Sequence, residues 1–144
     1  MGSFSTDLDK FIEKAGKNAD AVIRKVVLDI GAELVEMSPV GDGSSWISPP
    51  PAGYSGGRFR SNWSHSVGNA STNQYDTTSA SDSMDRITSS LPMKASGLVH
   101  YITNNLPYAQ RLEDGWSKQA PVGMVSITAT KFQSFINDAV KEVD

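Results

Sequence analysis

Seven apolar residues between positions 18 and 37 recur at the spacing of one helix face, and charged residues occupy the opposite face. The apolar set is Val22, Ile23, Val26, Val27, Ile30, Leu34 and Met37. This 3.6-residue periodicity predicts a long helix over 18–37. Ser38-Pro39 should end it, because the residue before a proline is disfavoured in the helical region. Gly31 costs about 1 kcal/mol relative to Ala and is expected to mark close packing.

Two further helices are predicted, one toward each end of the chain. The first begins after Thr6 or Asp7, either of which can cap it, and its apolar face is Leu8, Phe11, Ile12 and Ala15. The last covers 126–143, and its apolar side is Ile127, Phe132, Phe135, Ile136, Ala139, Val140 and Val143.

Residues 38–57 are predicted to form a long loop, because four of the seven prolines and five of the twelve glycines lie there. Loops of this length are uncommon in compact domains and are usually functional or mobile. The segment also carries Trp46 and Tyr54. These aromatic residues indicate either a flap packed back onto the domain or an anchor that meets a partner.

The central region alternates short strands with short helices. Strands are predicted at 63–67 and 97–103, a short helix at 82–91, and a helical turn at 107–114 with Gly115 as its cap. The fold class is therefore α+β, a small antiparallel sheet packed by N-terminal and C-terminal helices. Because an isolated two-stranded hairpin is marginal, either further strands lie near 71–78 and 116–125 or a neighbouring subunit completes the sheet.

Composition excludes several classes of protein. The 144 residues contain no cysteine, so disulfide frameworks, thiolate zinc sites and thiol nucleophiles are excluded. The formal net charge of −3 argues against a domain that grips nucleic acid through its phosphates. No apolar run approaches the ~20 residues that span a bilayer, and no secretory signal is recognisable at the N-terminus. We expect one domain, no membrane association and no cofactor.

Few residues are candidates for catalysis or metal binding. His65 and His100 are the two histidines, both on predicted strands, and either could join a Ser and an Asp in a catalytic triad. No Gly-x-Ser-x-Gly elbow accompanies them, so two structural histidines are the simpler interpretation. No metal-binding spacing is present. The glycine-rich run 53–57 lacks the Gly-Lys-Ser/Thr that completes a phosphate-binding loop.

Two local clusters combine aromatic and charged residues. In the first, Phe59 and Trp63 are spaced i, i+4 and are expected to pack inward, while Arg58 and Arg60 pair within the domain or across subunits. The second cluster is 108–116. If it is helical, Tyr108, Arg111 and Leu112 share one side and Glu113 faces away, followed by Trp116.

These two clusters carry a resemblance to a known family. The first motif is Ser38-Pro39-Val40-Gly41 followed by Gly56-Gly57-Arg58-Phe59-Arg60-Ser61-Asn62-Trp63. The second runs from Val99 through Asn104-Asn105-Leu106-Pro107-Tyr108-Ala109-Gln110-Arg111-Leu112-Glu113-Asp114-Gly115 to Ala120-Pro121. In this order, with helices before and after, they resemble the small tail-component proteins of tailed bacteriophages. The chain differs by inserting 42–55 within the first motif and by placing Gly56 where Thr is usual.

The resemblance implies a virion structural protein rather than an enzyme. Members of that family are tail completion, neck or minor tail proteins, including the lambda Z-like proteins, and act at head–tail joining. The resemblance implies a homo-oligomeric ring, six- or twelve-fold by analogy with phage necks, in contact with connector, tail terminator or tail tube proteins. DNA would pass through the lumen without specific binding, and the particle would be assembled in the host cytoplasm.

On this hypothesis the chain is one tail-completion or neck-type domain over 1–144. Its parts are N-terminal helices at 1–37, the loop at 38–57, sheet and short helices at 58–125, and a C-terminal helix at 126–144. The interface candidates are Trp46, Tyr54, Arg58, Phe59, Arg60, Trp63, Tyr108, Arg111, Glu113 and Trp116. The alternative is a small phage-encoded hydrolase or accessory binding module that uses His65 and His100.

Overall fold

The protein is a small α+β fold with helices at both ends of the described chain. The computed structural model describes residues 19–40, 56–115, 119 and 123–143. The elements in chain order are α2 (Ala19–Met37), η3 (Arg60–Asn62), β1 (Trp63–Val67), α3 (Ala80–Ser90), β2 (His100–Asn104), α4 (Ala109–Glu113), α5 (Val125–Thr130) and α6 (Phe132–Val143). The helix predicted over 18–37 and the strand over 63–67 are confirmed, and the other central elements lie within three residues of their predicted positions.

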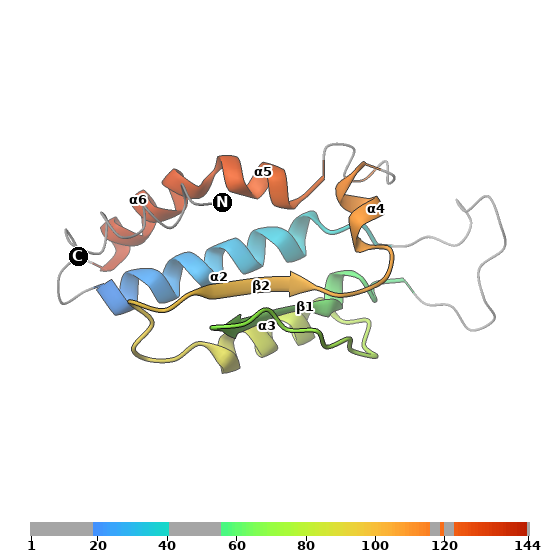
Figure 1. Ribbon diagram of the computed structural model, residues 1–144. Helices are drawn as coiled ribbons and strands as arrows, with labels where there is room; N and C mark the ends of the chain where they lie inside the picture. Colours follow the sequence, from blue (N-terminus) through green and yellow to red (C-terminus); the bar gives the residue numbers. More distant parts are fainter. Residues whose placement is uncertain (1–18, 41–55, 116–118, 120–122, 144) are drawn as a thin grey trace, which may run out of the picture.

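Helix α2 lies at the centre of the molecule. Figure 1 shows α5 and α6 along one side of α2, and β1, β2 and α3 along the other. Each side of α2 buries its own apolar cluster. Val22 and Val26 pack with Ile136 and Ala139 of α6. The larger cluster, toward the sheet, is Ile23, Val27, Leu34, Val35, Phe59, Trp63, Ile87, Leu91, Ala95, Leu106 and Met124.

The glycine within α2 permits a close contact between helices. A Cβ atom added at Gly31 would lie 2.9 Å from Cδ1 of Ile87, a fully buried side chain of α3. The expectation that Gly31 marks close packing is therefore confirmed, and the helix-propensity cost of glycine is offset by the buried apolar contact that it allows.

Strands β1 and β2 form a two-stranded antiparallel sheet. Trp63 lies opposite Asn104, His65 opposite Ile102 and Val67 opposite His100. A further strand at 71–78 is not formed. That segment is instead held by side chains next to η3, since Asn62 Oδ1 accepts a hydrogen bond from Tyr75 N at 2.8 Å and Ser61 Oγ donates to Thr77 O at 2.5 Å.

The prediction of one continuous C-terminal helix was wrong, because the helix is interrupted at Lys131 between α5 and α6. The residues before the break include Ile127, Thr128 and Thr130, and β-branched side chains lower helix propensity. Thr130 Oγ1 also donates to Ile127 O at 2.6 Å, a bond that competes with regular helix geometry.

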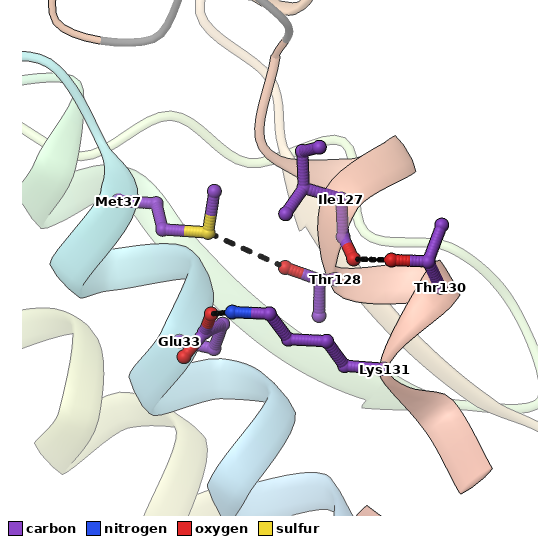
Figure 2. Close-up of polar contacts among 6 residues, drawn as sticks. All are labelled: Glu33, Met37, Ile127, Thr128, Thr130 and Lys131. Carbon is purple, nitrogen blue, oxygen red and sulfur yellow. Dashed lines mark hydrogen bonds and ion pairs between the residues drawn. The ribbon is translucent and has the colours of Figure 1, made fainter. Parts of the chain in front are cut away.

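The interruption coincides with contacts between α5 and α2, drawn in Figure 2. Lys131 Nζ forms an ion pair with Glu33 Oε1 at 2.5 Å. Thr128 Oγ1 lies 3.9 Å from the Met37 sulfur. The break therefore lets Lys131 and Thr128 both reach α2.

Several expectations concern residues outside the described ranges. These are the first predicted helix, most of the 38–57 loop with Trp46 and Tyr54, and Trp116. The single-domain division of 1–144 stays a prediction. In the parts of the chain that are described, no helix is both long and apolar enough to cross a membrane.

Candidate functional site

The motif segments that are distant in sequence meet at one corner of the molecule, which we call the motif corner: residues 38–40, 56–63 and 104–115. Trp63 and Asn104 face each other across the sheet. The Asn104 side chain donates from Nδ2 to the carbonyl oxygen of Phe59 at 2.8 Å. The second motif is thereby fixed to the first by both backbone register and a side-chain hydrogen bond.

Aromatic rings fill the centre of the motif corner. Phe59 and Trp63 meet edge to face, with ring centroids 5.7 Å apart. The Tyr108 ring lies 6.2 Å from that of Phe59. Phe59 and Trp63 are 4% and 3% exposed, so the expected inward packing is confirmed. Both rings are buried within the single chain, and their place at an interface stays a prediction. Tyr108 is 38% exposed.

The end of α2 is tied to the same centre. The indole Nε1–H of Trp63 donates to Ser38 Oγ at 2.7 Å, and that hydroxyl donates to Leu34 O at 2.6 Å. Val40 and Gln119 then exchange two hydrogen bonds, 2.9 Å from Val40 N to Oε1 and 2.8 Å from Nε2 to Val40 O. Ser38-Pro39-Val40 of the first motif is thus anchored on both sides.

Arg58 and Arg60 lie at the motif corner with no charged partner among the described residues. Both side chains are half-buried. Their Nε atoms are buried with no hydrogen-bond partner, and neither residue forms an ion pair among the described residues. An unpartnered buried donor costs free energy until it is satisfied. A planar guanidinium is suited to a carboxylate or a phosphate.

Glu113 turns toward α5 and caps it, where the sequence predicted only that it faces away from Tyr108. Its Oε1 accepts from the N–H of Met124 at 2.9 Å and of Val125 at 2.8 Å, while Oε2 accepts from Ser126 N at 3.1 Å and Ser126 Oγ at 3.0 Å. Burial acts to raise the pKa of Glu113, but these hydrogen bonds outweigh it and lower the pKa below its usual value. Glu113 therefore has a structural role. Arg111 lies on the same short helix, α4.

The two histidines form a second cluster, outside the motif corner. His65 Nε2 lies 2.8 Å from His100 Nδ1, and the rings stack with centroids 5.1 Å apart. His65 Nδ1 lies 2.7 Å from Ser90 Oγ, and His100 Nε2 lies 2.7 Å from Ala95 O. The sequence placed both residues on strands, but their contact was not predicted.

The carbonyl at the end of this series fixes the direction of the hydrogen bonds. Ala95 O can only accept, so His100 carries its proton on Nε2 and accepts at Nδ1 from His65 Nε2–H. Neutral His65 then accepts at Nδ1 from the Ser90 hydroxyl. Burial, and secondarily the nearby His100, lowers the pKa of His65 from 6.5 to about 4. The His65 ring is therefore neutral at pH 7.

A serine hydroxyl aligned with two imidazoles can in principle transfer a proton, but the surroundings do not favour acyl transfer. Ser90 is the last residue of α3, where helix carbonyls concentrate negative potential. An oxyanion needs N–H donors instead. In the described ranges, no group of three or more His, Asp or Glu is placed to hold a metal ion.

Comparison with protein-family models, with curated proteins and with solved structures finds no match to this chain. The motifs and the geometry of the motif corner therefore carry the functional conclusion.

Proposed function

We propose that this protein is a structural subunit of a phage neck or tail, acting as part of a ring in head–tail joining or tail completion. The observation that carries the proposal is the convergence of the two family-like motifs at the motif corner. Asn104 of one motif bonds to Phe59 of the other, and Tyr108 packs on the same ring. Motifs far apart in sequence that build one corner are consistent with a shared role.

The motif corner contains both buried residues and partly exposed ones, and this distribution supports an assembly role. Buried residues fix the geometry, as Trp63 does through Ser38. Arg58 and Arg60 form no ion pair among the described residues, and the Tyr108 ring is partly exposed. Arg and Tyr are enriched among the residues that carry binding energy at protein interfaces. In a ring each subunit would present this surface to a different surface of its neighbour.

The charge of the chain fits such a contact. Sixteen acidic residues outnumber thirteen basic ones, so a neighbouring copy has carboxylates to offer the two guanidiniums. The net charge of −3 also suits a ring through which DNA passes, because affinity for phosphates requires Lys and Arg. The partners would be copies of this chain and the connector, tail terminator or tail tube proteins above and below it.

Hydrolysis by the Ser90–His65–His100 series is the alternative function. The hydroxyl-to-imidazole distance of 2.7 Å favours it. The position of Ser90 at a helix C-terminus and the low pKa of His65 oppose it. An assay of purified protein with activated esters, compared with Ser90→Ala, separates the two functions. Turnover that Ser90→Ala abolishes would establish the hydrolase.

The assembly role is tested in a phage or prophage whose copy of this gene carries an early stop codon. We expect electron microscopy to show filled heads beside unjoined tails, and wild-type protein supplied in trans to restore joined particles. The double variant Arg58→Gln, Arg60→Gln should fail to restore them. The control Lys141→Gln alters an exposed α6 charge and should succeed. Normal particles without the protein would overturn the proposal.

A further inference from the structure

The two histidines and Ser90 form a continuous series of hydrogen bonds that joins β1, β2 and α3. Ser90 Oγ lies 2.7 Å from His65 Nδ1, and His65 Nε2 lies 2.8 Å from His100 Nδ1. At one end His100 Nε2 lies 2.7 Å from Ala95 O. At the other end Ser90 Oγ lies 3.0 Å from Ile87 O, a second acceptor for its hydroxyl. The series therefore ends at a carbonyl oxygen on each side.

These carbonyl oxygens restrict how hydrogens are arranged along the series. A carbonyl oxygen only accepts, so His100 Nε2 keeps its hydrogen in every arrangement. One hydrogen fits between His65 Nε2 and His100 Nδ1. In the neutral arrangement this hydrogen belongs to His65, and the Ser90 hydroxyl donates to His65 Nδ1. Each of the four ring nitrogens then has a hydrogen-bond partner.

The series takes up one further proton without losing any contact between the rings. Ser90 is exposed, so its hydroxyl passes a hydrogen to His65 Nδ1 and takes one from a hydronium ion. The hydrogen on His65 Nε2 moves to His100 Nδ1, and the Ser90 hydroxyl turns to Ile87 O. His65 ends neutral with its hydrogen on the other nitrogen, and His100 carries the added charge.

The surroundings favour placing the charge on His100 rather than on His65. His65 is 5% exposed, whereas His100 is half-buried at the beginning of β2. Burial, and secondarily charge on His100, lowers the pKa of His65 to about 4. A charged His100 donates to Ala95 O, and hydrogen bonds from a cation are stronger than neutral ones. The nearby C-terminus of α3, at Ser90, also stabilises positive charge.

The charged groups of the surrounding elements are engaged elsewhere or exposed. Arg86 of α3 donates to the carbonyl oxygens of Trp63 at 2.8 Å and Ser61 at 3.0 Å, and Asp85 is exposed. Tyr101 lies on the opposite face of the sheet from His100. From α2, Arg24 donates to the carbonyl oxygens of Leu91 and Pro92, while Asp20 accepts from Ser96 and attracts Lys94. Among the described residues, the ionisable group that contacts each ring is therefore the other histidine.

We propose that His65 and His100 form a one-proton switch. A proton taken up by the pair charges His100, moves the hydrogen of His65 from Nε2 to Nδ1, and turns the Ser90 hydroxyl from His65 to Ile87 O. A change in pH thereby reverses the direction of hydrogen bonding between the rings and places a positive charge at the beginning of β2. A second proton would put N–H groups on both facing nitrogens and end their hydrogen bond.

The switch goes beyond the proposed function and does not rest on it. Its three side chains lie outside the motif corner, on the second half of β1, the first residue of β2 and the last residue of α3. The particle-assembly experiment and the titration described next therefore succeed or fail independently of each other.

Nuclear magnetic resonance of the imidazole nitrogens tests the switch in the wild-type chain. The nitrogen chemical shifts distinguish a ring nitrogen that carries a hydrogen from one that does not. The protein is titrated between about pH 8 and pH 5, the range in which histidine ordinarily changes charge. We expect both rings to begin with the hydrogen on Nε2. On acidification His100 should gain a second hydrogen, and His65 should exchange Nε2–H for Nδ1–H at the same midpoint.

Three results of this titration would overturn the switch. The first is a doubly protonated His65 beside a neutral His100. The second is a His65 that keeps its hydrogen on Nε2 while His100 becomes charged. The third is no change in either ring before the chain unfolds.

Two neighbouring serines provide a variant and its control. Ser90→Ala removes the oxygen that accepts from His65 Nδ1 in the charged arrangement, and hydrogen bonds to charged groups are worth more than neutral ones. Proton binding by the pair should weaken about tenfold, which lowers the midpoint by about one pH unit. Ser89→Ala removes an exposed hydroxyl that donates to Asp85 O and should leave the midpoint unchanged. Equal midpoints in the two variants would overturn the part of Ser90 in the switch.

His100→Gln tests the coupling between the rings. The amide retains a donor for Ala95 O and an acceptor for His65 Nε2, but it takes no charge. His65 should therefore keep its hydrogen on Nε2 throughout the titration. Exchange to Nδ1 in this variant would show that His65 changes without His100, and it would overturn the proposal.

Discussion

His65 Nε2 and His100 Nδ1 lie 2.8 Å apart, so only one proton can occupy the space between them. In the neutral series Ser90 donates to His65. If His65 gains a proton on Nδ1, the Ser90 hydroxyl can turn to Ile87 O, 3.0 Å away, and every group remains satisfied. A second proton, on His100 Nδ1, would place N–H donors on both facing nitrogens. One proton on His65 therefore requires only that the Ser90 hydroxyl rotate to Ile87 O.

Acid should destabilise the protein through His65. Between pH 6.5 and about 4 the unfolded chain binds a proton at this residue that the folded chain does not, so the free energy of unfolding falls as the pH falls. The contribution is on the order of 2–3 kcal/mol. Urea denaturation from pH 7 to pH 4.5 should show this slope in wild type and a shallower one in His65→Gln. Identical slopes would contradict the lowered pKa.

Ser38→Ala should destabilise the fold by about 1–3 kcal/mol, because it leaves the buried Nε1–H of Trp63 without an acceptor. The matched control is Ser89→Ala on the exposed face of α3, where only a local bond to Asp85 O is lost. Its effect should be within about 0.5 kcal/mol of zero. Urea denaturation followed by Trp fluorescence measures both. Equal effects would show that the Trp63–Ser38 bond contributes nothing.

Glu113→Gln should cost about 1–2 kcal/mol, since a carboxylate that accepts four hydrogen bonds becomes an amide with one acceptor oxygen. The lowered pKa of Glu113 adds a pH dependence: its contribution is present above its unfolded value of 4.5 and is lost as the pH falls further. Asp114→Asn changes the neighbouring exposed carboxylate and should have little effect. Thermal unfolding at pH 7 compares the two. A larger loss in Asp114→Asn would refute the capping role.

Gly57→Ala should be much more damaging than Gly68→Ala. Both glycines have positive φ, 105° and 85°, so each substitution carries a conformational cost of about 1–2 kcal/mol. At Gly57 an added Cβ would also collide with the carbonyl oxygen of Thr78, whereas at Gly68 it meets open space. Chemical denaturation of the two variants isolates the collision. Similar stabilities would mean that the 78 region moves aside freely.

The sequence predicted the elements whose signal is local. The apolar periodicity of α2 and the alternation around His65 depend on neighbours a few positions apart, and both elements appear where expected. The break at Lys131 was missed because apolar spacing continues through it. The competing signals were the β-branched residues Ile127, Thr128 and Thr130 and the ion pair of Lys131 with Glu33.

The site was only partly predictable, because its contacts join distant positions. The inward packing of Phe59 and Trp63 follows from their i, i+4 spacing, and the structure confirms it. The contact of His65 with His100 depends on the register of β1 against β2. The two strands are joined by a long connection that includes α3, so no tight turn in the sequence indicates that register. From the sequence, Ser38 was predicted only to end a helix. In the structure its hydroxyl oxygen also accepts a hydrogen bond from the indole Nε1–H of Trp63.

The closure of β1 by Arg86 and Ser83 has a consequence for aggregation. Exposed sheet edges are templates on which chains stack without limit, and fibrils grow when each added strand leaves a fresh edge behind it. Here Ser83 Oγ accepts from the backbone N–H of Trp63 and Arg86 Nη1 donates to its carbonyl oxygen, so no added strand can pair at this residue. The beginning of β1 therefore offers no template on which a further strand could start to pair.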